Sequence, residues 1–176
     1  MKKIILFLSG LFILTNSFSQ NTKRVMLFLA PEVSPTLSDR TKANNLTGIG
    51  LGFQLTVNTK TKFSPTINIT DDFAFLDDKV FRTNSDGTEM LSLENVLKLF
   101  VGTNFNFTEA FYISLLAGPS FINGETLAGI KPSIGFYLPK TKRLTATVGY
   151  TTIFNRNSGQ KENYTSLNFS IGLRLN

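Results

Sequence analysis

The chain has 176 residues, contains neither cysteine nor histidine, and carries a formal charge of +6 at neutral pH. These absences exclude a serine-histidine-acid hydrolase site, a histidine metal site, a cysteine nucleophile and any disulfide. The modest positive charge is not gathered into a basic run interleaved with aromatic residues, so the sequence gives no indication of nucleic-acid binding.

Residues 1–19 have the pattern of a secretory signal peptide. Two lysines precede an apolar run from Ile4 to Leu14, and Ser17-Phe18-Ser19 offers small residues at the two positions that a signal peptidase reads. The apolar run is well short of the ~20 residues that a membrane-spanning helix requires, which favours cleavage close to Gln20 over a retained anchor. Residues 20–176 then form one mature domain, with no cysteine to carry a lipid anchor.

Alternation of large apolar residues with glycine or polar residues is the strongest pattern in the mature chain. It occupies Gly48 to Val57 and returns in residues 144–151 and 167–175. These runs exceed the ~5–6 residues usual for a soluble strand and approach the roughly 9–11 that a tilted strand needs to cross a bilayer. The pattern predicts membrane-spanning β-strands.

Eight strands are predicted, and the fold class is all-β. In chain order they are Arg24 to Val33, Leu46 to Val57, Lys62 to Thr70, Leu91 to Phe105, Ala110 to Gly118, Ala128 to Leu138, Arg143 to Phe154 and Tyr164 to Leu175. Residues 25–29, in the first strand, are apolar on both faces. Pro65 and Pro132 lack the N–H that a strand ladder uses, so a bulge or a strand end is expected at each. The stretch Phe73 to Phe81 is compatible with a strand extension or with a short helix.

The predicted connections alternate between long and short. Long polar connections follow the odd-numbered strands: Ser34 to Asn45, Asp71 to Met90, Pro119 to Leu127 and Asn155 to Asn163. Tight ones follow the even-numbered strands: Asn58 to Thr61, the stretch around Thr108-Glu109, and Pro139 to Lys142. Outer-membrane barrels place long loops outside the cell and short turns in the periplasm, so the alternation favours such a barrel.

The signal peptide, the eight alternating segments, the loop pattern and the terminal run from Ser166 to Leu175 together resemble the small outer-membrane β-barrel family of the OmpA and OmpX kind. The resemblance implies an eight-stranded antiparallel up-and-down transmembrane β-barrel in the cell outer membrane, with outer-membrane lipids and the barrel-insertion machinery as partners. Family members usually end the last strand with an aromatic residue that this machinery is thought to read. This chain ends Leu175-Asn176, and Phe169 or Leu175 could stand in for that residue.

An ionised side chain inside an eight-stranded barrel needs a partner, because the interior is only wide enough for side chains and a few waters. If the leucines of the fourth strand face lipid, Glu94 and Lys98 face inward, and Lys131 does so in the sixth strand. We therefore predict one interior polar cluster of Glu94, Lys98 and Lys131, and no open pore. No residue is assigned to catalysis, a cofactor or a metal, since the paired aspartates at 71–72 and 77–78 lack the spacing of a calcium loop.

Charge is divided unevenly between the two ends of the predicted barrel. The connection from Asp71 to Met90 has a net charge of −4, whereas the end with the short turns gathers eight basic residues against Glu109, for +7. The acidic loop is expected to face the medium, where divalent cations could bridge it to the phosphates of lipopolysaccharide. The basic end is expected at the anionic headgroups of the periplasmic leaflet.

Two function classes remain open. One is an integral outer-membrane protein without enzyme activity, with a structural or surface-interaction role in which the loops are the contact surface. The other is a secreted soluble barrel that is apolar inside and carries a small hydrophobic ligand, as lipocalins do. Glycines lie mainly on the polar face, where they suit a crowded interior, and tryptophan is absent. Both observations favour the membrane protein.

Overall fold

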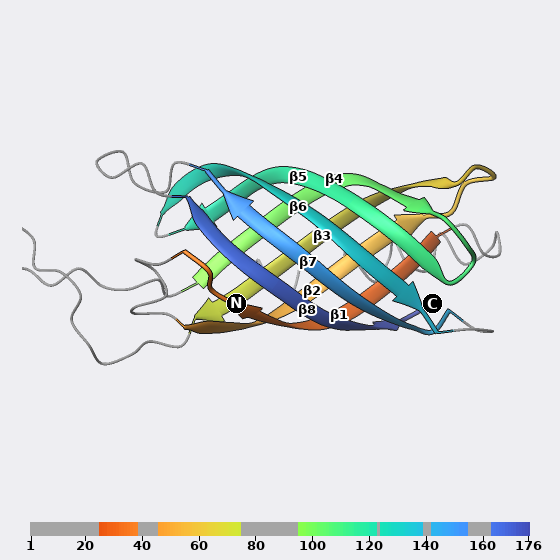
Figure 1. Cartoon of the computed structure of the whole chain (residues 1–176), viewed down its shortest axis with the longest axis horizontal. Coiled ribbons are helices and arrows are strands. Elements are labelled where there is room, and N and C mark those ends of the chain that lie inside the picture. Colours follow the sequence, from red (N-terminus) through yellow and green to blue (C-terminus); the bar gives the residue numbers. More distant parts are fainter. Residues whose placement is uncertain (1–24, 39–45, 75–94, 123, 139–141, 155–162) are drawn as a thin grey trace, which may run out of the picture.

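The computed structural model of the chain describes residues 25–38, 46–74, 95–122, 124–138, 142–154 and 163–176. They form eight strands: β1 Val25–Pro35, β2 Thr47–Val57, β3 Phe63–Ala74, β4 Asn95–Asn106, β5 Phe111–Ile122, β6 Glu125–Tyr137, β7 Leu144–Ile153 and β8 Tyr164–Arg174. Each strand pairs antiparallel with the next, and β8 pairs with β1, so the sheet closes into a barrel (Figure 1). The predicted fold class is confirmed.

The two ends of the barrel differ in their connections. Those after β1, β3, β5 and β7 lie at one end, which we call the loop end, and those after β2, β4 and β6 lie at the other, the turn end. The connection after β5 differs from the prediction of a long polar loop from Pro119 to Leu127. Pro119 does not end the strand; β5 and β6 stay paired as far as Ile122 and Glu125, and Gly124 turns the chain with a φ of 82°.

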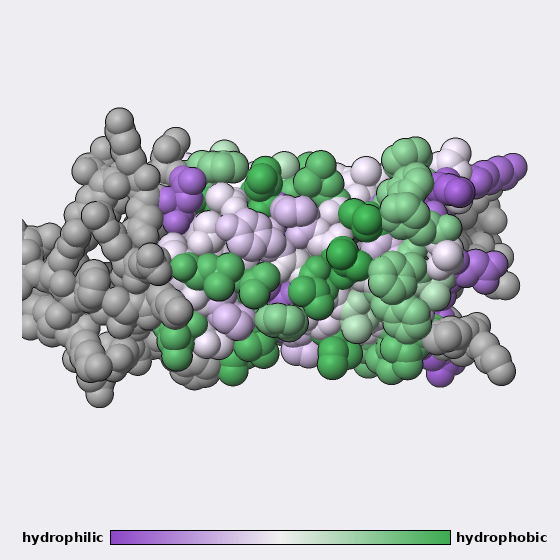
Figure 2. Space-filling model, viewed as in Figure 1, coloured by the Kyte–Doolittle hydropathy of each residue, from purple (hydrophilic) through white to green (hydrophobic). Residues whose placement is uncertain are grey.

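The outward face of the barrel is apolar. Exposed fractions of 47%, 48%, 45% and 63% at Leu51, Val148, Phe169 and Ile171 place these side chains outside, as the alternation predicts. Figure 2 shows hydrophobic residues along the middle of the visible face and strongly hydrophilic residues at the turn end. An exposed apolar surface of this extent suits hydrocarbon, not water, and the inverted lipocalin-like pattern is not present in the described strands. No helix among the described residues is long and apolar enough to cross a membrane.

The prolines interrupt hydrogen-bond ladders without ending strands. The backbone N–H and C=O groups of even-numbered residues of β6 point toward β7, since the N–H of Leu138 donates to Leu144 and the carbonyl of Ala128 accepts from Phe154. Pro132 therefore lacks the N–H that would reach β7, and the β6–β7 register has a gap at that position. Pro65 faces β2 just beyond the last pair of the β2–β3 ladder. The expected bulges and strand ends at these two prolines are replaced by one-sided gaps.

The seam between β1 and β8 is the least paired part of the barrel. Its register holds four pairs and one isolated bridge, whereas every other pair of neighbouring strands has between seven and twelve. The backbone N–H and C=O groups of odd-numbered residues of β1 point toward β8. This follows from two backbone hydrogen bonds: Leu27 accepts from Leu175, and Leu37 donates to Thr165. Pro31 and Pro35 are odd-numbered too, so each removes a donor from this seam.

The interior is packed in three layers along the barrel. Met26, Phe28, Tyr112 and Tyr137 form an apolar cluster at the turn end. A second cluster closes the loop end and consists of Val96, Ile122, Ile153 and Tyr164, with Leu127 packed against it. Buried polar and charged side chains lie between them. β3 continues through Phe73, so the first residues of the stretch from Phe73 to Phe81 extend a strand; the others lie outside the described residues.

Candidate functional site in the barrel interior

Four charged side chains meet in the middle layer, and we call them the interior charge cluster: Glu32 of β1, Asp72 of β3, Lys98 of β4 and Lys131 of β6. Lys98 Nζ lies 2.9 Å from Glu32 Oε1 and 2.5 Å from Asp72 Oδ2. Lys131 Nζ lies 2.7 Å from Glu32 Oε2. All four side chains are buried. Glu32 thus bridges the two lysines, and two positive charges balance two negative ones.

Neutral side chains complete the hydrogen bonding around this cluster. Asn168 of β8 donates from Nδ2 to Glu32 Oε1 over 3.0 Å and to Ser34 Oγ over 2.9 Å. Ser34 Oγ in turn donates to Asp72 Oδ2 over 2.9 Å. Thr151 of β7 donates to the carbonyl oxygen of the Asn168 side chain. The network therefore connects strands on opposite sides of the barrel, which fixes their positions relative to one another.

Glycine makes room for these charges. A Cβ added at Gly50 of β2 would lie 2.0 Å from Asp72 Oδ1, and one at Gly149 of β7 would lie 3.2 Å from Lys131 Cε. Gly50 is paired in register with Asp72, so the side chain leans across the space that a larger residue would fill. The glycine-rich alternation of β2 is thus a consequence of what its neighbours place inside the barrel.

Two of the three residues of the predicted polar cluster lie inside the barrel. Lys98 and Lys131 both point inward and are brought together through Glu32. Glu94 lies outside the described residues. The sequence interpretation did not include Glu32, because the start of β1 is apolar on both faces, nor Asp72, because the third strand was expected to end at Thr70. Extending the alternation of β3 by two residues places Asp72 inward and would have found it.

This arrangement supports a structural role, in which ion pairs and hydrogen bonds hold strands together across the barrel. Each lysine donates to at least one carboxylate, and buried ion pairs of this kind are strongly destabilising to break, since a lone charge then remains inside. The described residues contain no group of three or more histidine, cysteine or acidic side chains placed to hold a metal ion. The two aspartates at 71–72 point to opposite sides of the sheet: Asp72 is buried in the cluster, and Asp71 lies in the outward-facing row of β3.

Comparison with known proteins places the fold. No protein-family model matches the chain, and no curated protein matches it. Among solved structures, Ail, the attachment invasion locus protein of Yersinia pestis, aligns with a TM-score of 0.54 at 9% identity, covering 86% of this chain and 98% of Ail. Neisserial surface protein A aligns with a TM-score of 0.56 at 12% identity, covering 85% of this chain and 95% of that protein.

A protein from de novo design of transmembrane β-barrels also aligns, with a TM-score of 0.51 at 11% identity. The alignment covers 89% of this chain and all of the designed protein. Identities this low establish the fold and not the activity. Together with the apolar outer face, they confirm the resemblance made from the sequence at the level of architecture. The chain has the fold of the small eight-stranded outer-membrane β-barrels.

Proposed function

We propose that this protein is an integral outer-membrane barrel with a structural or surface-interaction role, without enzyme activity and without an open pore. The observation that carries the proposal is the apolar belt of exposed side chains around a closed barrel with a filled, polar interior. Such a body is stable in a bilayer and leaves the loop end as the part available for contact with partners.

The packed interior supports a non-conducting barrel. Lys98 and Phe100 have no exposed surface, and both ends of the described interior are closed by apolar side chains. The cavity lined by Glu32, Lys131, Asn68 and Leu116, among others, leaves the centre of a water molecule only about 10 Å³ of space, which is room for about one water. A continuous aqueous path through the barrel would need these layers to separate.

The location and partners of the protein follow from the same proposal. Ail, which has the same fold, is described as an outer membrane protein. We infer that residues 1–19 are removed as a signal peptide, that the barrel-insertion machinery assembles the protein, and that phospholipid and lipopolysaccharide surround it. The loops are the surface for a partner, and the acidic segment between β3 and β4 is the largest of them in the sequence.

Membrane fractionation combined with proteolysis tests this proposal. The protein should sediment with the outer membrane and be released by detergent but not by alkaline carbonate. Trypsin added to intact cells should cut in the connection between β3 and β4, after Lys79 or Arg82, and should spare the turn-end residues Lys60 and Lys62. Recovery in the soluble periplasmic fraction, or cleavage confined to the turn end, contradicts the proposed location or orientation.

A further inference from the structure

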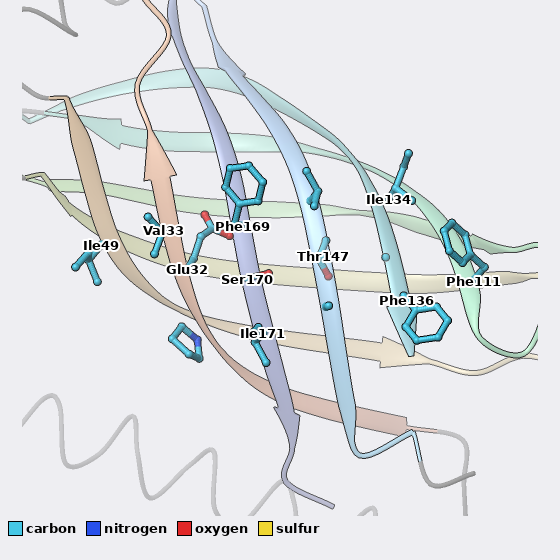
Figure 3. A pocket seen from close by; sticks show the side chains of 14 residues that line it. Glu32, Val33, Ile49, Phe111, Ile134, Phe136, Thr147, Phe169, Ser170 and Ile171 are labelled. Atoms are coloured by element: carbon cyan, nitrogen blue, oxygen red, sulfur yellow. The ribbon is translucent and has the colours of Figure 1, made fainter. Parts of the chain in front are cut away.

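An apolar groove with a volume of about 710 Å³ lies on the outward face across β5, β6, β7, β8, β1 and β2. Figure 3 shows labelled side chains of its two walls standing on neighbouring strands, from Phe111 of β5 at one extreme to Ile49 of β2 at the other. The floor of the groove is formed by the residues that lie between the two walls on each strand, such as Thr147 and Ser170.

Strand register arranges the walls as two parallel rows. The first row contains Phe111, Phe136, Ala146 and Ile171, which are successive register partners, and Pro31 at the corresponding position of β1. The second row contains Ile134, Val148, Phe169, Val33 and Ile49, which are also successive partners. The rows cross the strands along the hydrogen-bonding direction and are two residues apart on each strand.

Ala146 is the reason why a groove forms here. It occupies an outward position between Phe136 and Ile171, where a methyl group leaves a gap in the first row. The corresponding position of the second row is filled by Val148, between Ile134 and Phe169. The space over Ala146 is therefore bounded by large apolar side chains, and it lies within the belt that faces the bilayer.

The dimensions of the groove favour one hydrocarbon chain as its occupant. Positions two residues apart on a strand are separated by about 7 Å. An α-helix with its side chains is about 10–12 Å wide and cannot enter a channel of this width. A closed barrel offers no strand edge to another protein chain either. An acyl chain is the flexible apolar molecule that is present throughout the surrounding bilayer.

The charge at the turn end indicates which class of lipid supplies this acyl chain. The described residues of that end include Lys60, Lys62, Lys142, Arg143 and Arg174 against Glu109, for a net charge of +4. Arg143 is exposed and immediately precedes β7. It stands three residues from Ala146, about 10 Å along the strand. Lys142 Nζ lies 5.5 Å from the centre of the Tyr137 ring, which is buried inside the barrel, so this lysine is turned toward the interior. A phosphate placed beside Arg143 would hold its glycerol backbone above the turn-end side of the groove.

We propose that this groove binds one acyl chain of an anionic phospholipid of the turn-end leaflet, with the lipid phosphate at Arg143. The proposal rests on the barrel spanning a bilayer, which the proposed function also requires. It adds a defined lipid site to a surface that otherwise contacts lipid without selectivity.

Native mass spectrometry of the full mature protein tests the site. The protein is reconstituted with phosphatidylglycerol or with phosphatidylcholine of identical acyl chains, extracted in detergent, and measured for retained lipid. The wild type should retain one phosphatidylglycerol in preference to phosphatidylcholine. Ala146→Phe fills the groove and should lower retention of both lipids by about tenfold, the effect of removing roughly two buried methylene contacts.

Matched variants distinguish the acyl groove from the headgroup contacts. Ala117→Phe changes an equivalent outward alanine on β5, between Val101 and Ile130 and outside the groove, and should leave retention unchanged. Arg143→Gln should remove the preference for phosphatidylglycerol while retaining lipid. Lys142→Gln, which removes an ammonium that lies over the Tyr137 ring, should keep the preference. Circular dichroism confirms that each variant is folded.

Three results overturn the proposal: equal retention by Ala146→Phe and Ala117→Phe, no preference for the anionic lipid in the wild type, or a second copy of the chain in place of lipid. If no variant retains lipid although all insert into vesicles, the lipid site is wrong and the proposed membrane function stands.

Discussion

Glu32 is the residue on which the interior charge cluster depends, because Lys98 and Lys131 both donate to it. Glu32→Gln leaves two buried lysines facing the single carboxylate of Asp72. We expect the free energy of unfolding to fall by about 3–5 kcal/mol, the usual result of breaking a buried pair from one side. Urea titration of the barrel folded into lipid vesicles measures this loss.

The double variant Glu32→Gln with Lys131→Met provides the control for that prediction. It removes one positive charge together with the negative one, and should recover part of the lost stability. If Glu32→Gln alone matches the wild type, the cluster contributes nothing to folding and its residues are free for another role.

Gly135 shows how closely the turn end is packed. A Cβ added there would lie 2.0 Å from Tyr112 Cζ, and the Tyr112 hydroxyl is hydrogen bonded to Thr145 and Thr147 at 3.2 and 2.9 Å. Gly135→Ala must push this ring away from its partners and should cost about 1–3 kcal/mol. Gly149→Ala is the comparison, since an added Cβ there comes no closer than 3.2 Å to any atom, the nearest being Lys131 Cε and Ser133 Cβ. A smaller loss is expected there in the same urea titration, and equal losses at the two glycines would contradict the packing argument.

At the scale of the strands, alternation and length identify all eight elements because membrane-spanning strands are long and face two different environments. Boundaries are harder to predict. Proline is typical of a strand end, yet at Pro119 the strand continues. The missing N–H lies where the register of β4 and β5 has a gap. Alternation likewise assigns Lys98 and Lys131 to the inside, but it gives no height along the barrel. Their shared partner Glu32 depends on pairing register, which the pattern of one strand does not contain.

Pro132 allows the cost of a ladder gap to be measured. Its outward position tolerates a side chain, and a restored N–H would donate to the Tyr150 carbonyl of β7. Pro132→Val should therefore stabilise the barrel by about 1 kcal/mol, since a gained hydrogen bond in an apolar setting exceeds the entropy that proline removes from the unfolded chain. Pro65→Val is a second test, because the register of β2 and β3 places residue 65 opposite Val57, the last residue of β2. The prediction fails if Pro132→Val is no more stable than the wild type.

At the scale of the whole molecule, the layered interior predicts an electrically silent protein. Apolar clusters close both ends of the described interior, and the charge cluster between them is internally neutralised. Purified barrels inserted into a planar bilayer should pass no unitary current at moderate voltages. Trypsin added to each side then shows that barrels are present in the bilayer. Stable current steps from the wild type would contradict a filled interior.

The sparse pairing between β1 and β8 also has a kinetic consequence. This seam joins residues as distant in sequence as Phe28 and Arg174, so its closure costs the largest loop entropy and returns the fewest hydrogen bonds. The barrel therefore behaves as a curved eight-stranded sheet that is closed along one weakly paired seam. Formation of the sheet and closure of the seam become separate folding steps, and closure comes last. When the barrel fluctuates, it opens first along the line where the two ends of the chain meet.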